Sequence, residues 1–306
     1  MTVAETIQSL TKTHLDSGYG LLFGQCITAV GWIQHTVPPG CPGLVELPMS
    51  DVSGPGIAVG AALMGRRPIL VLRFQSFLWL AASPIVNYAA KSMDIWGVPC
   101  PLLIRAIATE GNGAGPVHSN CFHSVFAHMP GLTVLAPMTP SQYRTAWDEW
   151  LSGSGPVLMS EHRTSYQSDR EFADTRTWQD ADSSTRHVTV IALSASQFRM
   201  EEVRAQCADE GIELDIIYCW RLKPFVATEN IRGSLETTGC GLVIDAGFEI
   251  CGIARSIAYE LTQLTGYPVM ALGQADRSSG VAPRLENGTP SVERIVEAIH
   301  RLIQRR

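Results

Sequence analysis

Short apolar runs bounded by Pro or Gly alternate with segments of helical length along most of this sequence. Residues 69–75 and 101–107 are runs of this kind, and residues 78–93 between them have the length and composition of a helix. Short, nearly continuous apolar runs are typical of parallel strands buried on both faces. The pattern therefore predicts an α/β fold with a mostly parallel sheet. Further strands are expected at 132–136 and 156–160, with a helix at 140–151.

A polar stretch separates two such patterns. Residues 165–186 are rich in Asp, Ser, Thr, Arg and Gln, which is typical of a linker. The alternation then restarts, so we predict two doubly wound domains with mostly parallel sheets, at 1–165 and 187–306, joined by a linker at 166–186. The second domain is expected to hold strands at 187–193, 214–218, 241–245 and 269–272, and helices at 198–210, 228–237, 252–265 and 291–304.

The composition excludes several classes of function. The 306 residues carry a formal net charge of -6, so the chain lacks the basic surface that binds nucleic acid or an anionic membrane. Its apolar runs are too short to span a membrane, and residues 1–20 lack a signal-peptide core. None of the 8 cysteines forms a CxxC pair, which argues against zinc and a disulfide framework. We expect a cytoplasmic protein with reduced thiols.

One carboxylate stands at the start of a helix made of small residues. Asp51 precedes residues 53–65, which are mostly Gly, Ala and small aliphatic residues. Such a helix lets a flat ligand or another backbone come very close, because its residues lack long side chains. Two roles for Asp51 are open at this point. It is either a ligand-binding acid or a helix N-cap, since Asp favours that position and Pro55 lies close to a first turn.

Two further segments carry chemically useful side chains. Phe77 follows a predicted strand, where an aromatic ring serves either as core or as a stacking surface. Residues 111–122 form a glycine-rich loop with His118, which can donate a proton or hold a carboxylate near neutral pH. His118, His123 and His128 recur every five residues, a step that turns successive members of a helix about 140° apart. We therefore predict no metal site and structural roles for His123 and His128.

These segments resemble the β chain of thiamine-diphosphate-dependent 2-oxo acid dehydrogenases and the matching region of transketolases. The resemblance is densest over residues 47–137. It implies that Asp51 is the acid that hydrogen-bonds to the pyrimidine ring of the cofactor, with Gly54 and Gly56 also binding the cofactor. The family acid is glutamate, and aspartate is shorter by about 1.5 Å. A closer backbone, a bridging water or weaker activation would follow from this difference.

The same resemblance gives roles to the other two segments. It implies that Phe77 stacks on the pyrimidine ring and that His118 faces the reacting carbon of the substrate. The family loop ends in His-Ser-Gln, whereas Asn120 stands here in place of glutamine. The second domain resembles the C-terminal domain of the family at 221–225, 245–252 and 285–290. In the family, that domain serves mainly in assembly.

The diphosphate half of a cofactor site is missing from this sequence. Family members hold the diphosphate through Mg²⁺ bound at a Gly-Asp-Gly motif, and no such motif occurs in these 306 residues. The resemblance therefore implies a partner, an α-type subunit that carries the Mg²⁺ and diphosphate site, in an assembly of the α2β2 kind. The cofactor, thiamine diphosphate, would then lie at the subunit interface.

The resemblance implies an enzyme subunit that acts on a 2-oxo acid or ketose by decarboxylation or by transfer of an acyl or two-carbon unit. Two alternatives stay open. The Gly115-Pro116-Val117-His118 run is similar to the transketolase histidine motif and would suit the C-terminal half of a split transketolase. Aspartate in place of glutamate at Asp51 would suit a non-catalytic or regulatory paralogue.

Overall fold

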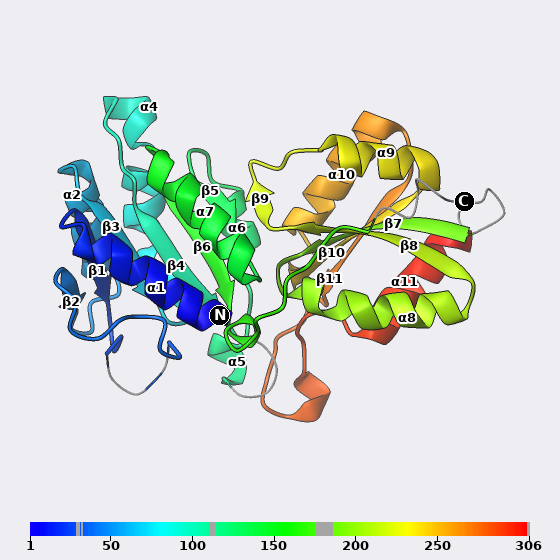
Figure 1. The fold of residues 1–306 in the computed structure, drawn as a ribbon, viewed down its shortest axis with the longest axis horizontal. Coiled ribbons are helices and arrows are strands. Elements are labelled where there is room, and N and C mark those ends of the chain that lie inside the picture. Colours follow the sequence, from blue (N-terminus) through cyan, green and yellow to red (C-terminus); the bar gives the residue numbers. More distant parts are fainter. Residues whose placement is uncertain (29–30, 32, 110–113, 176–185, 305–306) are drawn as a thin grey trace. The chain divides into compact units, whose positions relative to one another are not determined.

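The chain folds into two units (Figure 1). The computed structural model describes residues 1–28, 31, 33–109, 114–175 and 186–304. The first unit comprises residues 1–109 and 125–171, and the second comprises residues 110–124 and 172–306. A short internal segment of the chain therefore groups with the C-terminal half, although the residues on both sides of it belong to the N-terminal half.

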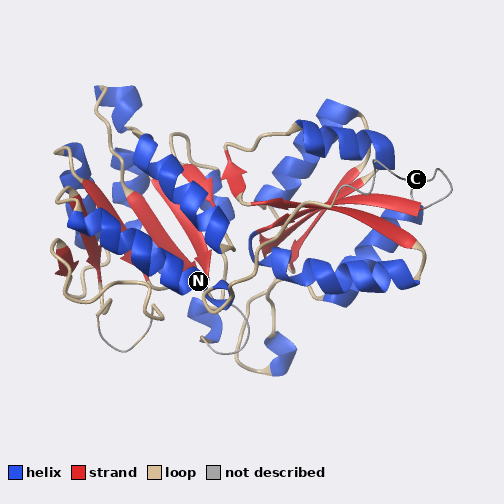
Figure 2. Cartoon of the chain, viewed as in Figure 1, coloured by secondary structure: helices blue, strands red, loops and turns tan. Residues whose placement is uncertain are grey.

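The first unit is built on a parallel sheet (Figure 2). Its strands lie in the order β2, β1, β3, β4, β6, β5, and each neighbouring pair is parallel. The strands β4 and β6 are buried along their whole length, as the continuous apolar runs predicted. The strands are β1 (Gly20–Gly24), β2 (Leu44–Glu46), β3 (Arg67–Leu72), β4 (Leu103–Ala108), β5 (Thr133–Leu135) and β6 (Val157–His162).

Helices with clear sequence signals pack around this sheet. Thr2 caps the first helix in a reciprocal capping box with Glu5, and Thr139 caps α7, which begins with Pro140. The small-residue helix predicted after Asp51 is present as α2. The α-helices are α1 (Val3–Asp16), α2 (Ser53–Leu63), α3 (Leu78–Ala82), α4 (Ser92–Trp96), α6 (His123–Ala127, which spans the boundary of the two units) and α7 (Pro140–Ser152), with 3₁₀ turns η1 (Gln75–Phe77) and η3 (Arg163–Ser165).

The single helix predicted over residues 78–93 is wrong in one respect. After α3 the backbone enters a π-helical stretch, η2 (Ser83–Ala89), before α4 begins at Ser92. Pro84 lies in this stretch and has no N–H to donate, so the regular ladder is interrupted. The N–H of Ala90 accordingly donates to the carbonyl of Ile85, five residues back, at 2.9 Å.

The second unit is a three-layer α/β/α arrangement. Its parallel strands lie in the order β11, β10, β7, β8. Helices α8 and α11 cover one face and share a core with it, and α9 and α10 lie on the other (Figure 1). The elements are α5 (Gly115–His118), β7 (Arg186–Leu193), η5 (Ser194–Arg199), α8 (Met200–Asp209), β8 (Ile212–Cys219), β9 (Arg221–Lys223), α9 (Glu229–Thr238), β10 (Gly241–Phe248), α10 (Ile253–Thr265), β11 (Val269–Gln274), η6 (Pro283–Leu285) and α11 (Val292–Gln304).

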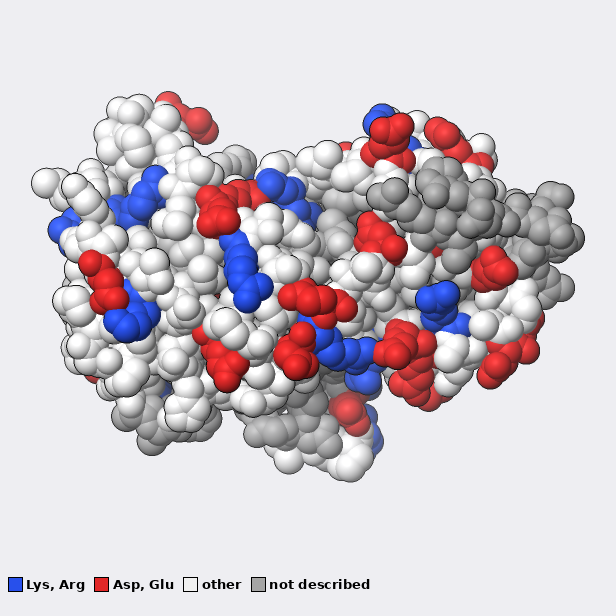
Figure 3. All heavy atoms as spheres, viewed as in Figure 1, with Lys and Arg blue, Asp and Glu red and all other residues white. Residues whose placement is uncertain are grey.

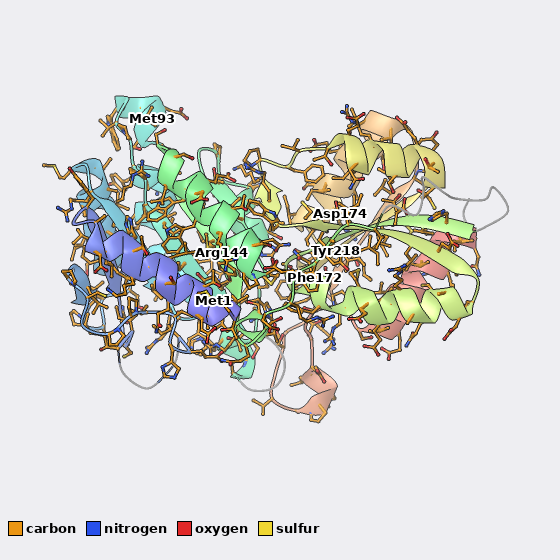
Figure 4. The ribbon with its side chains drawn as sticks, in the orientation of Figure 1. Met1, Met93, Arg144, Phe172, Asp174 and Tyr218 are labelled. Atoms are coloured by element: carbon orange, nitrogen blue, oxygen red, sulfur yellow. The ribbon has the colours of Figure 1, made fainter. Side chains whose placement is uncertain are left out.

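Part of the predicted linker lies against the edge of the second sheet. Thr175 hydrogen-bonds with the backbone of β8, donating its N–H to the carbonyl of Ile216 at 2.9 Å. The ring of Phe172 stacks on Tyr218 with 4.9 Å between centroids, and Asp174 accepts from the N–H of Tyr218 at 2.9 Å (Figure 4). Residues 176–185 of the predicted linker lie outside the described residues. Among the described helices, none combines the length and hydropathy that a membrane span needs.

A buried ion pair joins two central strands of the first unit. Arg105 on β4 contacts Glu161 on β6, with 2.5 Å between Nε and Oε1, and neither side chain is exposed. Thr36 and Tyr166 add hydrogen bonds at 2.8 and 2.5 Å. Burial opposes the charge of Arg105, but Glu161 outweighs it, so the pKa of the guanidinium is raised. The pair is stable only while both partners are present.

We predict that Glu161→Ala lowers the free energy of unfolding by about 3–5 kcal/mol, because it leaves the Arg105 charge buried without its counterion. Urea denaturation of the purified chain measures the change. Asp16→Ala is the control, since it breaks an exposed ion pair with Lys12 and should leave stability nearly unchanged. Equal effects of the two variants would contradict the prediction.

Candidate functional site

Asp51 lies in the turn between β2 and α2, and it does not cap the helix. Val52 holds the N-cap position, and no side-chain hydrogen bond is made there. The Asp51 carboxylate instead accepts a hydrogen bond from Nε2 of Gln25, which lies 3.1 Å from Oδ1. The N-cap role considered for Asp51 is therefore wrong in this structure.

Asp51 and Phe77 line one pocket of about 310 Å³ at the carboxyl ends of β1 and β3. This is the edge at which open parallel sheets bind their ligands. The two residues come from separate segments of the sequence, and the fold brings them together. The lining residues are Gly24, Gln25, Leu47, Asp51, Pro55, Leu70, Val71, Leu72, Arg73 and Phe77.

The walls of this pocket suit one flat ring with a polar edge. Most of the lining is apolar, with Asp51, Gln25 and Arg73 as its polar members. At Gly24, an added Cβ would lie 2.6 Å from Ile27 Cγ2 and 3.0 Å from the carbonyl oxygen of Val71. A side chain at position 24 would therefore displace the pocket wall. An aromatic ring, a carboxyl group and apolar walls are the kinds of group that suit the pyrimidine ring of thiamine diphosphate.

Phe77 ends the short turn η1 that follows β3. Its ring is half-buried, whereas the ring of Phe74 is buried and meets it edge-on with 6.0 Å between centroids. The guanidinium of Arg73 lies 5.6 Å from the centroid of Phe77. A cation on an aromatic face is a favourable contact, and it supports the ring in one orientation.

Gln25 is a site residue that the sequence analysis missed. It follows β1 directly, and its Oε1 is buried without a hydrogen-bond partner among the described residues. A buried, unpaired acceptor is costly unless a ligand or water satisfies it. The signal that would have found it is its place after a strand, at the carboxyl edge of the sheet, but β1 itself was not predicted.

The remaining residues near the pocket have separate explanations. Gly54 is closely packed, since an added Cβ would lie 2.8 Å from Leu47 Cδ1 and this side chain would have to shift. Gly56 is exposed and has open space around it. Neither glycine is among the residues that line the pocket. The Glu46 carboxylate accepts from the backbone N–H groups of Ile27 and Thr28 at 3.0 and 3.1 Å, so it stabilises the loop after β1.

His118 belongs to the second unit, whereas Asp51 and Phe77 belong to the first. It is the last residue of α5, and its side chain is half-buried. Asn120 holds the following turn, since its Nδ2 donates to the carbonyl of Pro116 at 3.1 Å. Residues 111–113 of the predicted glycine-rich loop lie outside the described residues.

His123 is buried beside a carboxylate, and His128 is exposed. Nε2 of His123 lies 2.8 Å from Oδ2 of Asp245, and Nδ1 lies 3.1 Å from Sγ of Cys121. No cluster of three or more metal-binding side chains occurs in the described part of the chain. The imidazole of His123 therefore has a structural partner, as predicted for this residue.

Large apolar side chains are exposed on the helical segments from α2 to α4 of the first unit. The exposed fraction reaches 84% at Met64, and the rings of Tyr88 and Trp96 stack with 6.3 Å between centroids. Extended apolar patches on a protein surface usually mark an interface. We call this set the α2–α4 surface: Ile57, Met64, Trp79, Leu80, Tyr88, Met93, Ile95 and Trp96, with Met93 labelled in Figure 4.

Charges are mixed on the face shown in Figure 3. Acidic and basic side chains alternate over it, with no continuous basic stripe among the residues drawn in colour. This agrees with the net charge of -6. Neither observation favours a nucleic-acid ligand.

Comparison with known proteins identifies the family. The model of the transketolase pyrimidine binding domain matches residues 45–168, which include Asp51, Phe77 and His118. The β subunit of acetoin:2,6-dichlorophenolindophenol oxidoreductase from Cupriavidus necator is 30% identical over 231 residues, which cover 72% of this chain and 67% of that protein. The chain belongs to this family of β subunits.

A further relative agrees in sequence, and a solved structure agrees in fold. The human mitochondrial pyruvate dehydrogenase E1 β subunit is 26% identical over 277 residues, covering 85% of this chain and 77% of that protein. A split-gene transketolase, described as an inactive β4 tetramer, superposes with a TM-score of 0.75 at 17% identity over 98% of this chain and 97% of its own. The predicted α/β fold, the family and the enzyme class of its members are confirmed.

The His123–Asp245 pair of this β subunit makes its stability depend on pH. Burial opposes the charge of His123, but Asp245 and Cys121 outweigh it, so the pKa of the imidazole is raised well above its usual value. The folded protein therefore binds a proton more tightly than the unfolded chain. The resulting stabilisation is complete below the unfolded pKa of about 6.5 and is lost as pH rises through the folded pKa.

We predict that the difference in unfolding free energy between wild type and His123→Gln is largest near about pH 6 and shrinks at alkaline pH. Denaturant titrations over this range measure it. The exposed His128 provides the control variant, His128→Gln, which should show no such trend. A difference for His123→Gln that does not change with pH would contradict the prediction.

Proposed function

We propose that this β subunit forms half of the cofactor site of a heteromeric thiamine-diphosphate-dependent enzyme. Its substrate would be a 2-oxo acid or ketose, which is decarboxylated or gives up an acyl or two-carbon unit. One observation carries the proposal. Asp51 and Phe77 line the same pocket, in the part of the chain that matches the pyrimidine binding domain.

Each of the pocket residues would make a different contact with the pyrimidine ring of the cofactor. Phe77 would provide an aromatic face, and the carboxyl group of Asp51, when protonated, would donate a hydrogen bond to a ring nitrogen. Gln25 orients that carboxylate through its amide nitrogen and keeps its own oxygen for a donor on the ligand. Gly54 and Gly56 would lie beside the cofactor. When bound, thiamine diphosphate supplies the nucleophilic carbon and the electron sink of the reaction.

The Gln25–Asp51 hydrogen bond is relevant to the shorter side chain at position 51, where aspartate has one methylene fewer than the glutamate of the family. The amide nitrogen of Gln25 donates a hydrogen bond to the Asp51 carboxylate at 3.1 Å, and this contact helps to fix the orientation of the carboxylate. The remaining gap to a ring nitrogen would be closed by backbone approach or by a water. His118 would act at the substrate, donating to a developing alkoxide or holding a carboxylate.

A second polypeptide would complete the site. No Gly-Asp-Gly motif is present, so Mg²⁺ and the diphosphate would be held by an α-type subunit. The α2–α4 surface supports a partner, because its large apolar side chains remain exposed on the single chain. The expected assembly is α2β2, by analogy with relatives whose names identify them as β subunits.

Two alternatives have weaker support. The run Gly115–His118 and the fold of a split-gene transketolase favour a split transketolase, but that structure is only 17% identical. The aspartate at position 51 favours a non-catalytic paralogue, but the pocket and its buried acceptor at Gln25 are retained. We therefore favour the catalytic β subunit.

We predict that Asp51→Ala lowers kcat of the reconstituted enzyme by about 10²–10⁴, the usual contribution of a positioned acid or base. Asp51→Glu should keep most of the activity, because it restores the family residue. Asp148→Ala, which removes an exposed carboxylate of α7 in the same unit, is the control and should have no effect. Full activity in Asp51→Ala would overturn the proposal.

We also predict that the purified chain binds thiamine diphosphate with Mg²⁺ only weakly, and that the α-type partner restores tight binding. Isothermal titration with and without the partner measures this. Ile57→Asp, on the exposed face of α2, should block assembly, whereas Val226→Asp, at an exposed apolar site of the second unit, should not. Tight binding by the chain alone would refute the shared site.

A further inference from the structure

The segment that carries His118 is attached to the second unit by side chains far away in the sequence. Three contacts among the described residues are neutral. Ser279 Oγ lies 3.4 Å from Asn120 Oδ1, the ring of Phe122 lies 6.3 Å from that of Phe248, and Ser124 Oγ accepts from the N–H of Ile253 at 3.1 Å. The first of the three is long for a hydrogen bond.

The fourth attachment is charged and buried. His123 and Asp245 are 0% and 1% exposed, and 2.8 Å separates Nε2 from Oδ2. The two residues are 122 positions apart in the sequence. Removing one partner of a buried ion pair leaves the other charge buried without its counterion, which is strongly destabilising. His123 lies only five residues after His118.

Asp245 is itself held in place from its own side. Ser194 Oγ donates to Oδ1 of Asp245 at 2.5 Å, and Ser194 Oγ itself accepts from the N–H of Ala246 at 3.1 Å. Ser194 adopts a left-handed backbone, with φ of 46°, to reach this position. At Gly247 an added Cβ would lie 2.7 Å from Asp245 Oδ2, so only glycine leaves room for the pair. The carboxylate of Asp245 is therefore held by contacts that do not involve His123.

We propose that the buried His123–Asp245 pair is the tether that fixes the His118 segment to the second unit. Asp245 and Ser194, both in the C-terminal half, are then positioning residues for His118. The tether rests on contacts within the second unit alone, whereas its catalytic consequence rests on the function proposed for His118. The C-terminal unit thus serves the active site as well as assembly.

Hydrogen exchange read by mass spectrometry tests the tether directly on the full chain. In Asp245→Asn, the backbone amides of residues 115–124 should exchange about tenfold faster or more than in wild type, because the segment opens without unfolding the unit. Unchanged exchange in these peptides would overturn the proposal. The double variant His123→Gln/Asp245→Asn replaces the ion pair by two neutral amides and should recover part of the protection.

A second buried pair of the same chemistry gives the matched control. His187 lies 3.3 Å from Asp215, which is fully buried, and both residues belong to adjacent strands of the second unit. Asp215→Asn should therefore change exchange in β7 and β8 and leave residues 115–124 as in wild type. Faster exchange of 115–124 in this control would show general loosening and would overturn a specific tether.

Kinetic measurements on the reconstituted enzyme distinguish a failure of the tether from a failure of the proposed function. In Asp245→Asn, kcat should fall about tenfold or more, towards the value of His118→Ala, while KM for thiamine diphosphate stays within about twofold. Asp215→Asn should keep kcat. Faster exchange together with unchanged kcat in both Asp245→Asn and His118→Ala would uphold the tether and overturn the catalytic role of His118. A rise in KM for the cofactor without loss of kcat would overturn the positioning role.

Discussion

Parallel pairing of β1 with β2 and β3 is the constraint on which the pocket depends. In a parallel sheet, neighbouring strands end at the same edge, so the residues that follow them converge. Gln25 follows β1, Phe77 follows β3 through one short turn, and Asp51 follows β2 before α2 begins. None of these side chains is close to the others in sequence. Their meeting in one pocket is a consequence of strand order.

The second unit adds a constraint of a different kind. Its parallel sheet ends β10 at Phe248, and Asp245 near that end forms a buried ion pair with a residue that precedes the main part of the unit by about fifty positions. A buried charge has few stable arrangements, which makes such a pair a specific point of attachment. Residues 110–124 therefore belong to the second unit, although the residues before and after them in the sequence belong to the first.

Periodic and compositional signals predicted the fold well. The apolar runs around β3, β4 and β6 predicted buried strands, because a strand covered on both faces needs apolar residues at nearly every position. The interrupted helix at 78–93 was not predicted in detail, because composition reports helical preference and the π-helical step at Pro84 depends on local hydrogen bonding. The strand β1 was not predicted, because only three apolar residues lie between its terminal glycines.

The candidate site was predicted only where single residues resemble a family motif. Asp51 and Phe77 are of this kind, and the pocket contains both. Gln25 and the His123–Asp245 pair were missed, since each depends on a contact between residues 26 and 122 positions apart. Local patterns contain no information on such pairs, which arise only when strand order and packing are known.

The central claim is that Asp51 activates thiamine diphosphate from the pyrimidine side of a shared site. The most direct measurement is the rate at which the thiazolium C2 proton of the bound cofactor exchanges with deuterated water in the assembled enzyme. The account predicts that Asp51→Asn slows this exchange by about 10²-fold or more while the cofactor stays bound. An exchange rate equal to that of wild type, with the cofactor bound in both, would contradict it.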